Sequence, residues 1–292
     1  MATLQDIRRR IRSVQSTQKI TRAMKLVSAA KLRRAQDRIL GARPYASRMA
    51  DLVVALVRGL GEDKHPLLVH RDGGRKLYVV ITADKGLAGA FNSNVNRRAA
   101  ELLGAGADGS AALVTIGRKS RDFFRRRRWK LRADRIGFLD RLTFEQARTL
   151  AGELVAAFLN DEVDEVWLVF NEFRSMAVQR VAVLRLLPIE PPGGDAAGEG
   201  PGVEYLYEPD PATILDALLP QHVEIQLYRA LLESTAAEHA ARMTAMEAAT
   251  KNAQELIELL SIRYNKARQE RITKELLDIV GGAEALRTGT KA

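Results

Sequence analysis

Cysteine is absent from this 292-residue chain, and aromatic residues make up only 5% of it. The first absence excludes disulfides, thiolate metal ligands and cysteine nucleophiles. No window approaches the run of about 20 apolar residues that spans a bilayer. No apolar segment follows the charged first twelve residues, so we predict no secretory signal peptide. We expect a soluble, helix-rich protein that reaches a membrane only through partners.

Positive charge is concentrated in the first sixty residues. They hold 14 Lys and Arg against 3 Asp and Glu, whereas the remainder holds 32 basic and 33 acidic residues. A basic segment of this kind fits an acidic partner such as nucleic acid, an anionic membrane or an acidic protein surface. A basic coiled-coil protein that binds nucleic acid is therefore one alternative reading.

Long helices are predicted at both ends of the chain. Residues 3 to about 58 carry apolar side chains at spacings of three and four, and Thr3 with Asp6 forms a near capping box. Gly41 and Pro44 predict a kink or break in this helix, and Pro220 marks a place for a kink in the second, which runs from Pro211 to about 286. The N-terminal apolar stripe comprises Leu4, Ile7, Ile11, Val14, Ile20, Met24, Val27, Leu32, Ala35 and Ile39. The C-terminal stripe comprises Met243, Met246, Ala249, Ala253, Leu256, Ile257, Leu260 and Tyr264.

The middle of the chain has the pattern of an open α/β sheet. Buried strands are predicted at 76–82, 111–116, 165–173 and 178–187, and the last two are close enough for a hairpin. Helices are predicted at about 94–103 and 143–159, the second capped by Thr143, and a basic helix or turn is predicted at 119–128. Alternation of this kind indicates a mostly parallel sheet with an antiparallel edge. Polar, Gly- and Pro-bearing segments at 61–74 and 191–202 are predicted to be a linker and a loop.

The predicted fold class is α/β: two long terminal helices form an antiparallel coiled coil beside a central Rossmann-like α/β domain. The expected boundaries are 1–60 for the N-terminal helix, 75–190 for the domain and 209–287 for the C-terminal helix. Because both helices are tied to one domain, they must run antiparallel. A nearly all-polar stretch at 265–271 should lie where the N-terminal helix ends.

Motifs for chemistry are weak. The turn at 83–94 follows a strand and precedes a helix, but Gly86 and Gly89 do not make a dinucleotide fingerprint, and a tight structural turn is the better interpretation. The four histidines have no metal spacing, and we expect His65 and His70 to be solvated. We therefore predict no catalytic residue, no metal site and no cofactor. A dinucleotide-dependent enzyme is the second alternative.

Several longer motifs resemble the gamma subunit of F-type ATP synthase. They are SVQSTQKITRAMKLVSAAKLRRAQ at 13–36, DKGLAGAFN at 84–92, YLYEPD at 205–210, ARMTAMEAATKNA at 241–253 and YNKARQERITKELLDIVGGAEAL at 264–286. Lys85 stands where this family typically has Arg, and Ala88 where it often has Cys. The thiol-bearing regulatory insertion of the chloroplast branch is missing.

The resemblance implies a rotor rather than an enzyme. The two terminal helices would form a shaft inside a ring of alpha and beta subunits, with catalysis on beta. The α/β domain would sit with the epsilon subunit on the membrane c ring, peripherally at the cytoplasmic face of a bacterial plasma membrane. Ion flow through the ring would turn the shaft and drive ATP synthesis.

The same resemblance implies roles for particular residues. Contact with beta is expected at Arg268, Gln269, Lys85, Met24 and Lys25. Contact with the c ring is expected at Glu204, Tyr205 and Tyr207. A bearing surface that turns in an apolar sleeve is expected at Ile272, Leu276, Ile279 and Val280.

Overall fold

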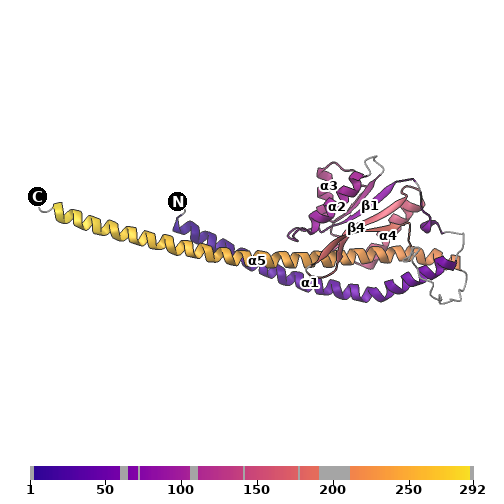
Figure 1. Ribbon diagram of the computed structural model, residues 1–292, viewed down its shortest axis with the longest axis horizontal. Coiled ribbons are helices and arrows are strands. Elements are labelled where there is room, and N and C mark those ends of the chain that lie inside the picture. The colour runs from indigo at the N-terminus through magenta and orange to yellow at the C-terminus, as the bar shows by residue number, and fades with distance from the viewer. Residues whose placement is uncertain are drawn as a thin grey trace. The chain divides into compact units, whose positions relative to one another are not determined.

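The chain forms two compact units, one made of residues 1–27 with 245–292 and the other of residues 28–244. The computed structural model describes residues 3–59, 65–71, 73–105, 111–140, 142–176, 178–190 and 211–289 (Figure 1). Two long helices, α1 (Leu4–Gly59) and α5 (Pro211–Gly289), contribute to both units. The loop predicted at 191–202 and the extended piece at 204–210 lie outside the described residues.

Both long helices are uninterrupted. Helix α1 continues through Gly41 and Pro44, and α5 continues through Pro220, so none of these residues ends a helix. The Thr3 hydroxyl accepts a bond from the backbone N–H of Asp6 at 3.2 Å, and the Asp6 carboxylate accepts one from the backbone N–H of Thr3 at 3.1 Å. This reciprocal pair caps α1 as predicted, because it satisfies donors that the first helical turn leaves open.

The larger unit contains a five-stranded sheet in the order β3-β2-β1-β4-β5. Its strands are β1 (Lys76–Ile81), β2 (Ala112–Ile116), β3 (Ala133–Arg135), β4 (Glu165–Phe173) and β5 (Gln179–Leu187). The first four are parallel, and β5 pairs antiparallel with β4. The mixed sheet and its antiparallel edge match the sequence prediction. Strand β3 was not predicted, because three residues carry no readable period.

Both faces of the sheet are buried. In β1, Leu77, Val79 and Ile81 face one hydrophobic cluster, and Tyr78 and Val80 face another. Helices α2 (Phe91–Ala105) and α3 (Arg118–Arg126) cover the second cluster. Helix α4 (Phe144–Leu159) and parts of α1 and α5 cover the first. Burial on both faces explains why the parallel strands read as continuous apolar runs.

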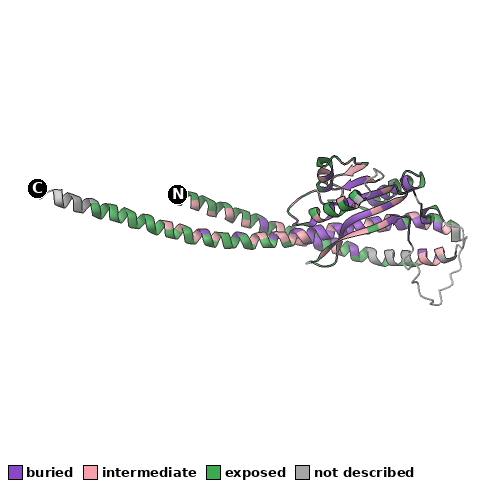
Figure 2. Ribbon diagram, turned by 45° about the horizontal axis from the view of Figure 1, so that its top comes forward, coloured by how far each residue is buried: buried purple, intermediate pink, exposed green. Residues whose placement is uncertain are grey.

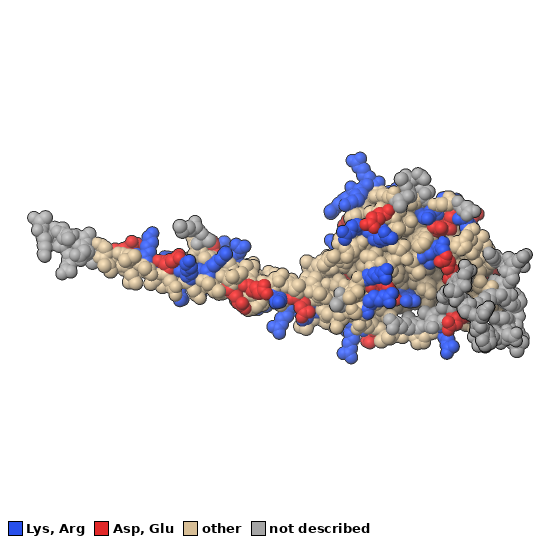
Figure 3. Space-filling model, in the orientation of Figure 1, with Lys and Arg blue, Asp and Glu red and all other residues tan. Residues whose placement is uncertain are grey.

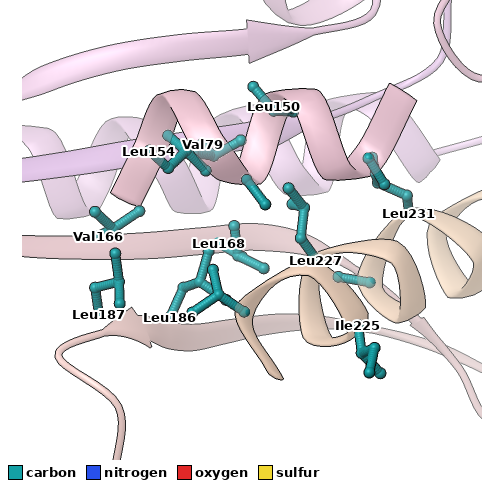
Figure 4. Close-up of a cluster of buried hydrophobic side chains, with 14 of the residues drawn as sticks. Val79, Leu150, Leu154, Val166, Leu168, Leu186, Leu187, Ile225, Leu227 and Leu231 are labelled. Carbon is teal, nitrogen blue, oxygen red and sulfur yellow. The ribbon is translucent and has the colours of Figure 1, made fainter. Parts of the chain in front are cut away.

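Figure 4 shows how the first cluster is assembled from distant parts of the chain. Leu154 of α4 and Leu168 of β4 lie in the same buried cluster as Leu227 of α5. Figure 2 shows the buried residues gathered along the strands and the adjoining part of α5. The long C-terminal helix is therefore anchored by the sheet's core over its first half.

The segment predicted as a polar linker contributes to the core instead. A short 3-10 helix, η1 (Pro66–Leu68), buries Leu67 and Leu68, and the backbone N–H of Ile189 donates to the Leu67 carbonyl at 2.8 Å. His65 caps this turn by accepting from the Leu67 N–H and pairs with Asp216 at 3.2 Å. His65 is therefore half-buried and bonded, which corrects the expectation of a solvated side chain.

The smaller unit is an antiparallel pair formed by the start of α1 and the second half of α5. Across it Gln18 donates to Gln254 at 2.7 Å, and Lys25 pairs with Glu247 at 2.5 Å. Residue numbers rise on one helix as they fall on the other, so the predicted antiparallel coil is present. The α1 residues that are buried or half-buried at alternating spacings of three and four are Leu4, Ile7, Ile11, Val14, Gln18, Thr21 and Lys25. On α5 the corresponding residues are Met246, Thr250, Ala253, Ile257, Leu260 and Tyr264.

These residues define a seam with a heptad spacing. The predicted α1 stripe follows the seam as far as Val14 and then departs from it. Ile20 and Val27 are 60% and 57% exposed, and polar residues take the seam positions beside them. The sequence prediction was wrong here because apolar residues at 20, 24 and 27 also fit a helical spacing.

Candidate functional site

The far end of α5 is exposed along its whole circumference. Gln18 pairs with Gln254, so Leu4, fourteen residues earlier on α1, lies level with Arg268, fourteen residues later on α5. Every residue from Arg268 to Gly281 is exposed. The polar stretch at 265–271 therefore lies beside the N-terminus of α1, as expected.

Apolar side chains on this end of α5 are also open to solvent. The exposed fractions are 49% for Ile272, 57% for Leu276, 68% for Ile279 and 63% for Val280. Their neighbour Arg271 is held along the helix by Glu275 at 2.8 Å. Exposed apolar patches on a water-facing helix mark a surface that binds something. This end of the helix has the composition of an interface.

Arg268 and Gln269 lie at the boundary between the coil and this end of α5. Both side chains are exposed, and neither makes an ion pair or side-chain hydrogen bond with the described residues. A guanidinium in that state keeps all its donors for an incoming carboxylate or carbonyl. Arg268 and Gln269 are therefore accessible at the level of Leu4, the first residue of α1.

Met24 and Lys25 lie at a different level of the same unit. Lys25 is paired with Glu247, and Met24 is half-buried. Glu247 precedes Arg268 by 21 residues along α5, roughly 30 Å at 1.5 Å per residue. The structure therefore does not bring these two predicted contact regions together.

The turn before α2 in the larger unit is held by its own side chains. The Asp84 carboxylate accepts from the backbone N–H of Arg118 at 2.8 Å and from that of Gly137 at 2.9 Å. The Asn92 side chain accepts from Ala83 N–H at 2.9 Å. These bonds tie the turn to the start of α3 and to the loop at Gly137. The interpretation of the turn as structural fits this geometry better than a phosphate cradle.

Lys85 projects from that turn. Its side chain is 69% exposed and lies 3.5 Å from Asp140. An exposed pair of this kind contributes little to stability. The Lys85 side chain, which belongs to the larger unit, is thus accessible to a partner.

A buried ion pair that the sequence prediction missed joins the turn to α5. Arg242 pairs with Glu238 at 2.7 Å, and its other terminal nitrogen donates to the Gly86 carbonyl at 3.3 Å. Burial raises the pKa of Glu238, while the Arg242 charge acts to lower it. A Glu and an Arg four residues apart resemble an ordinary surface pair, so the spacing alone gave no signal of burial.

The remaining candidates are quickly placed. Glu204, Tyr205 and Tyr207 lie outside the described residues. Within the described part of the chain, no group of three His, Asp or Glu side chains is arranged to hold a metal ion. No described helix has both the length and the apolar content that a bilayer span requires.

Several exposed basic side chains of the larger unit are paired with carboxylates. Arg125 pairs with Asp134 at 3.6 Å and Arg135 with Glu153 at 2.7 Å. Figure 3 shows Lys and Arg interspersed with Asp and Glu over the visible surface of the larger unit. A nucleic-acid site needs a continuous basic stripe, and this surface does not supply one.

Comparison with known proteins places the chain in a family. The family model described as ATP synthase matches residues 3–286. The ATP synthase gamma chain of an Anaeromyxobacter species is 50% identical over 292 residues, covering 98% of this chain and all of that protein. The gamma chain of Pelotomaculum thermopropionicum is 46% identical over 286 residues, with the same coverage.

Solved structures agree on the fold. A chain of the Euglena gracilis mitochondrial ATP synthase, in a structure of its OSCP, F1 and c-ring parts, aligns with a TM-score of 0.69. It is 21% identical, and the match covers 99% of this chain and 96% of that one. A central-stalk and c-ring structure from Tetrahymena thermophila gives a TM-score of 0.60 at 23% identity, covering 79% and 99%. With gamma-chain relatives at half identity over nearly its whole length, the chain belongs to the ATP synthase gamma chain family.

Proposed function

We propose that this chain is the central rotor shaft of an F-type ATP synthase and has no catalytic site of its own. The coiled coil turns inside a ring of alternating alpha and beta subunits, and ATP chemistry occurs on beta. Ion flow through the membrane c ring supplies the torque. Family membership and the two-helix architecture support this proposal.

One observation carries it furthest: the outside of the coiled coil carries exposed apolar side chains as well as charged ones. Exposed fractions reach 60% at Ile20, 65% at Leu26, 56% at Leu259 and 67% at Ile262. A free-standing coiled coil in water needs charged outer positions. Apolar outer positions on both helices fit a coil that is surrounded by protein.

Rotation would act through differential contacts. Each orientation of an asymmetric shaft stabilises a different conformer in each of three beta subunits, so their populations shift in sequence. Arg268 and Gln269 supply unpaired polar groups for a loop of beta, where hydrogen bonds depend on angle. Ile272, Leu276, Ile279 and Val280 supply non-directional apolar contacts, which oppose rotation least.

The larger unit would form the base of the rotor. We assign the epsilon subunit and the c ring to it, with Glu204, Tyr205 and Tyr207 against the ring. Lys85 of the larger unit would also meet beta, as would Met24 and Lys25 of the coil. The protein would then lie peripherally at the cytoplasmic face of a bacterial plasma membrane and be attached only through these partners.

Reconstitution tests the proposal. The purified chain should hydrolyse no ATP, and mixing it with cognate alpha and beta subunits should yield a stable complex with ATPase activity. A control mixture lacking the chain fixes the background rate. ATPase activity of the isolated chain, or no association with alpha and beta, would refute it.

A further inference from the structure

A small pocket in the larger unit is lined by an uneven set of charges. It has a volume of about 140 Å³ and lies between α1, α5 and the loop that precedes α4. Lys31, Arg34 and Arg38 form its α1 wall. Their spacing of three and four puts them on one helix face. The pocket therefore has a wall of three cations from a single helix.

The acidic side chains at this pocket each have a cation beside them. Asp140 has Lys85 at 3.5 Å, and Glu238 has Arg242 at 2.7 Å. Neither Lys85 nor Arg242 lines the pocket. Lys31 and Arg34 make no ion pair with the described residues, so the positive charge of the α1 wall is not compensated from within the unit.

The opposite wall holds a buried ring nitrogen with no partner. His239 is only 9% exposed, and its Nδ1 atom has no hydrogen bond within the described residues. Burial and the charges of Arg242 and Lys31 lower the pKa of His239 to about 4, so the ring is neutral near pH 7. A neutral imidazole carries one N–H, and a buried polar group without a partner is costly. A bound phosphate would remove that cost, because its oxygens accept from an N–H and its remaining proton can be donated to a bare ring nitrogen.

We propose that this pocket binds inorganic phosphate, held by Lys31, Arg34 and Arg38 on α1 and by the imidazole of His239 on α5. Charge-assisted bonds from three cations match an oxyanion. The volume equals that of only a few water molecules at about 30 Å³ each, so a phosphate fits and a whole nucleotide does not. A metal cation is disfavoured, because no metal-holding group of side chains is found among the described residues.

A phosphate bound here would bridge three elements of the unit. Its contacts would join the α1 wall to His239 on α5, beside the loop that carries Leu139 and Leu142. An ion that binds the folded unit and not the unfolded chain stabilises it in proportion to its occupancy. Phosphate would therefore stiffen the attachment of the two helices, whether or not the chain acts as a rotor.

Titration of the purified full-length chain with inorganic phosphate tests the site. Phosphorus NMR should show saturable binding that persists in about 0.15 M chloride, an ionic strength that screens generic attraction. Replacing Arg34 or Lys31 with Gln should weaken binding about tenfold each, the effect of losing a charge-assisted hydrogen bond. Both side chains are exposed, so the fold should survive, and thermal unfolding without phosphate checks this.

The matched control is Arg33→Gln. Arg33 directly precedes Arg34 on α1, is also exposed and lines a different groove. It should change phosphate affinity less than twofold. Equal losses from Arg33→Gln and Arg34→Gln would show nonspecific attraction and overturn the proposal, as would the absence of saturation. Binding of ATP or ADP without binding of phosphate would also overturn it.

Discussion

The hydroxyls of Thr21 on α1 and Thr250 on α5 lie 2.7 Å apart across the seam of the smaller unit. Thr21 is 8% exposed, so this contact sits inside the coil and not on its rim. The Gln18–Gln254 bond lies on one side of it and the Lys25–Glu247 pair on the other. Three polar contacts in a row define the register, because a slip of either helix would break all three of them.

Crosslinking tests this register directly. The chain has no cysteine, so the double variant Thr21→Cys with Thr250→Cys introduces the only two thiols. Their hydroxyl contact places the side chains within disulfide range, and we expect nearly complete intramolecular crosslinking under mild oxidation. Non-reducing electrophoresis measures the shift. Thr21→Cys with Lys251→Cys, one residue around the helix, should crosslink far less; similar yields from both pairs would contradict the register.

The buried pair of Glu238 and Arg242 should be the most sensitive charge pair in the larger unit. Their side chains are 11% and 9% exposed, and Arg242→Met leaves a buried carboxylate without its cation. We expect a loss of about 3 kcal/mol in the free energy of unfolding, measured by urea titration. Adding Glu238→Gln should restore most of it.

The control for this pair is Arg148→Met in α4. Arg148 pairs with Glu145 at 3.2 Å, and the two side chains are 55% and 67% exposed. Solvent screens such a pair, so the change should cost less than about 1 kcal/mol. If Arg242→Met proved as mild as Arg148→Met, the buried pair would not hold the turn to α5.

The protonation of His239 should make the larger unit acid-sensitive. Its pKa is about 4 in the folded chain against an ordinary 6.5. Between these values the unfolded state binds a proton that the folded state does not. The free energy of unfolding should therefore fall by up to about 3 kcal/mol as pH drops from 6.5 to 4. Above pH 6.5 the stabilising contribution of the neutral ring is fully present.

Urea titrations at several pH values measure this slope. His222 is also buried with a lowered pKa, and it contributes in the same direction. The comparison of wild type with His239→Gln isolates the contribution of one ring. The wild type should lose stability relative to the variant as pH falls through this window. Parallel pH profiles for the two proteins would contradict the assignment.

Local chemistry made several elements predictable. Thr143 caps α4, and its reciprocal bond with Gln146 forms a complete capping box. Strands β1 and β4 have apolar runs of β-branched residues because both faces of the sheet are covered. In each case neighbouring residues in the sequence contain the information. The same holds for the two long helices, where apolar residues recur at helical spacing for many turns.

The missed features depend on partners far apart in the chain. Burial of Leu67 requires the strand end at Ile189, and burial of Glu238 and Arg242 requires the turn at Gly86. The seam passes through Gln18, which the predicted apolar stripe left out, because the Gln18 side chain bonds to Gln254 on the other helix. Periodicity reports which residues share a face, and it cannot report which face meets a neighbour. The contact roles of Arg268, Gln269 and Lys85 stay predictions for the same reason.

Replacing Arg268 and Gln269 with Ala should weaken coupling between ATP hydrolysis and rotation, or lower the yield of the complex. Both side chains are exposed and unbonded within the described residues, so their loss should leave the isolated chain as stable as before. The number of ions pumped per ATP and the complex yield measure the effect. The matched control is Lys274→Ala, also exposed on α5, which should behave as wild type. Normal coupling and yield in the double variant would rule out these two contacts.

Single-molecule rotation tests the central claim most directly. Lys130→Cys gives the chain one exposed thiol in the larger unit, to which a bead can be attached. With cognate alpha and beta subunits fixed to a surface, added ATP should turn the bead in one direction, with three pauses per revolution. A complex that hydrolyses ATP while the bead stays fixed relative to alpha and beta would contradict the rotor assignment.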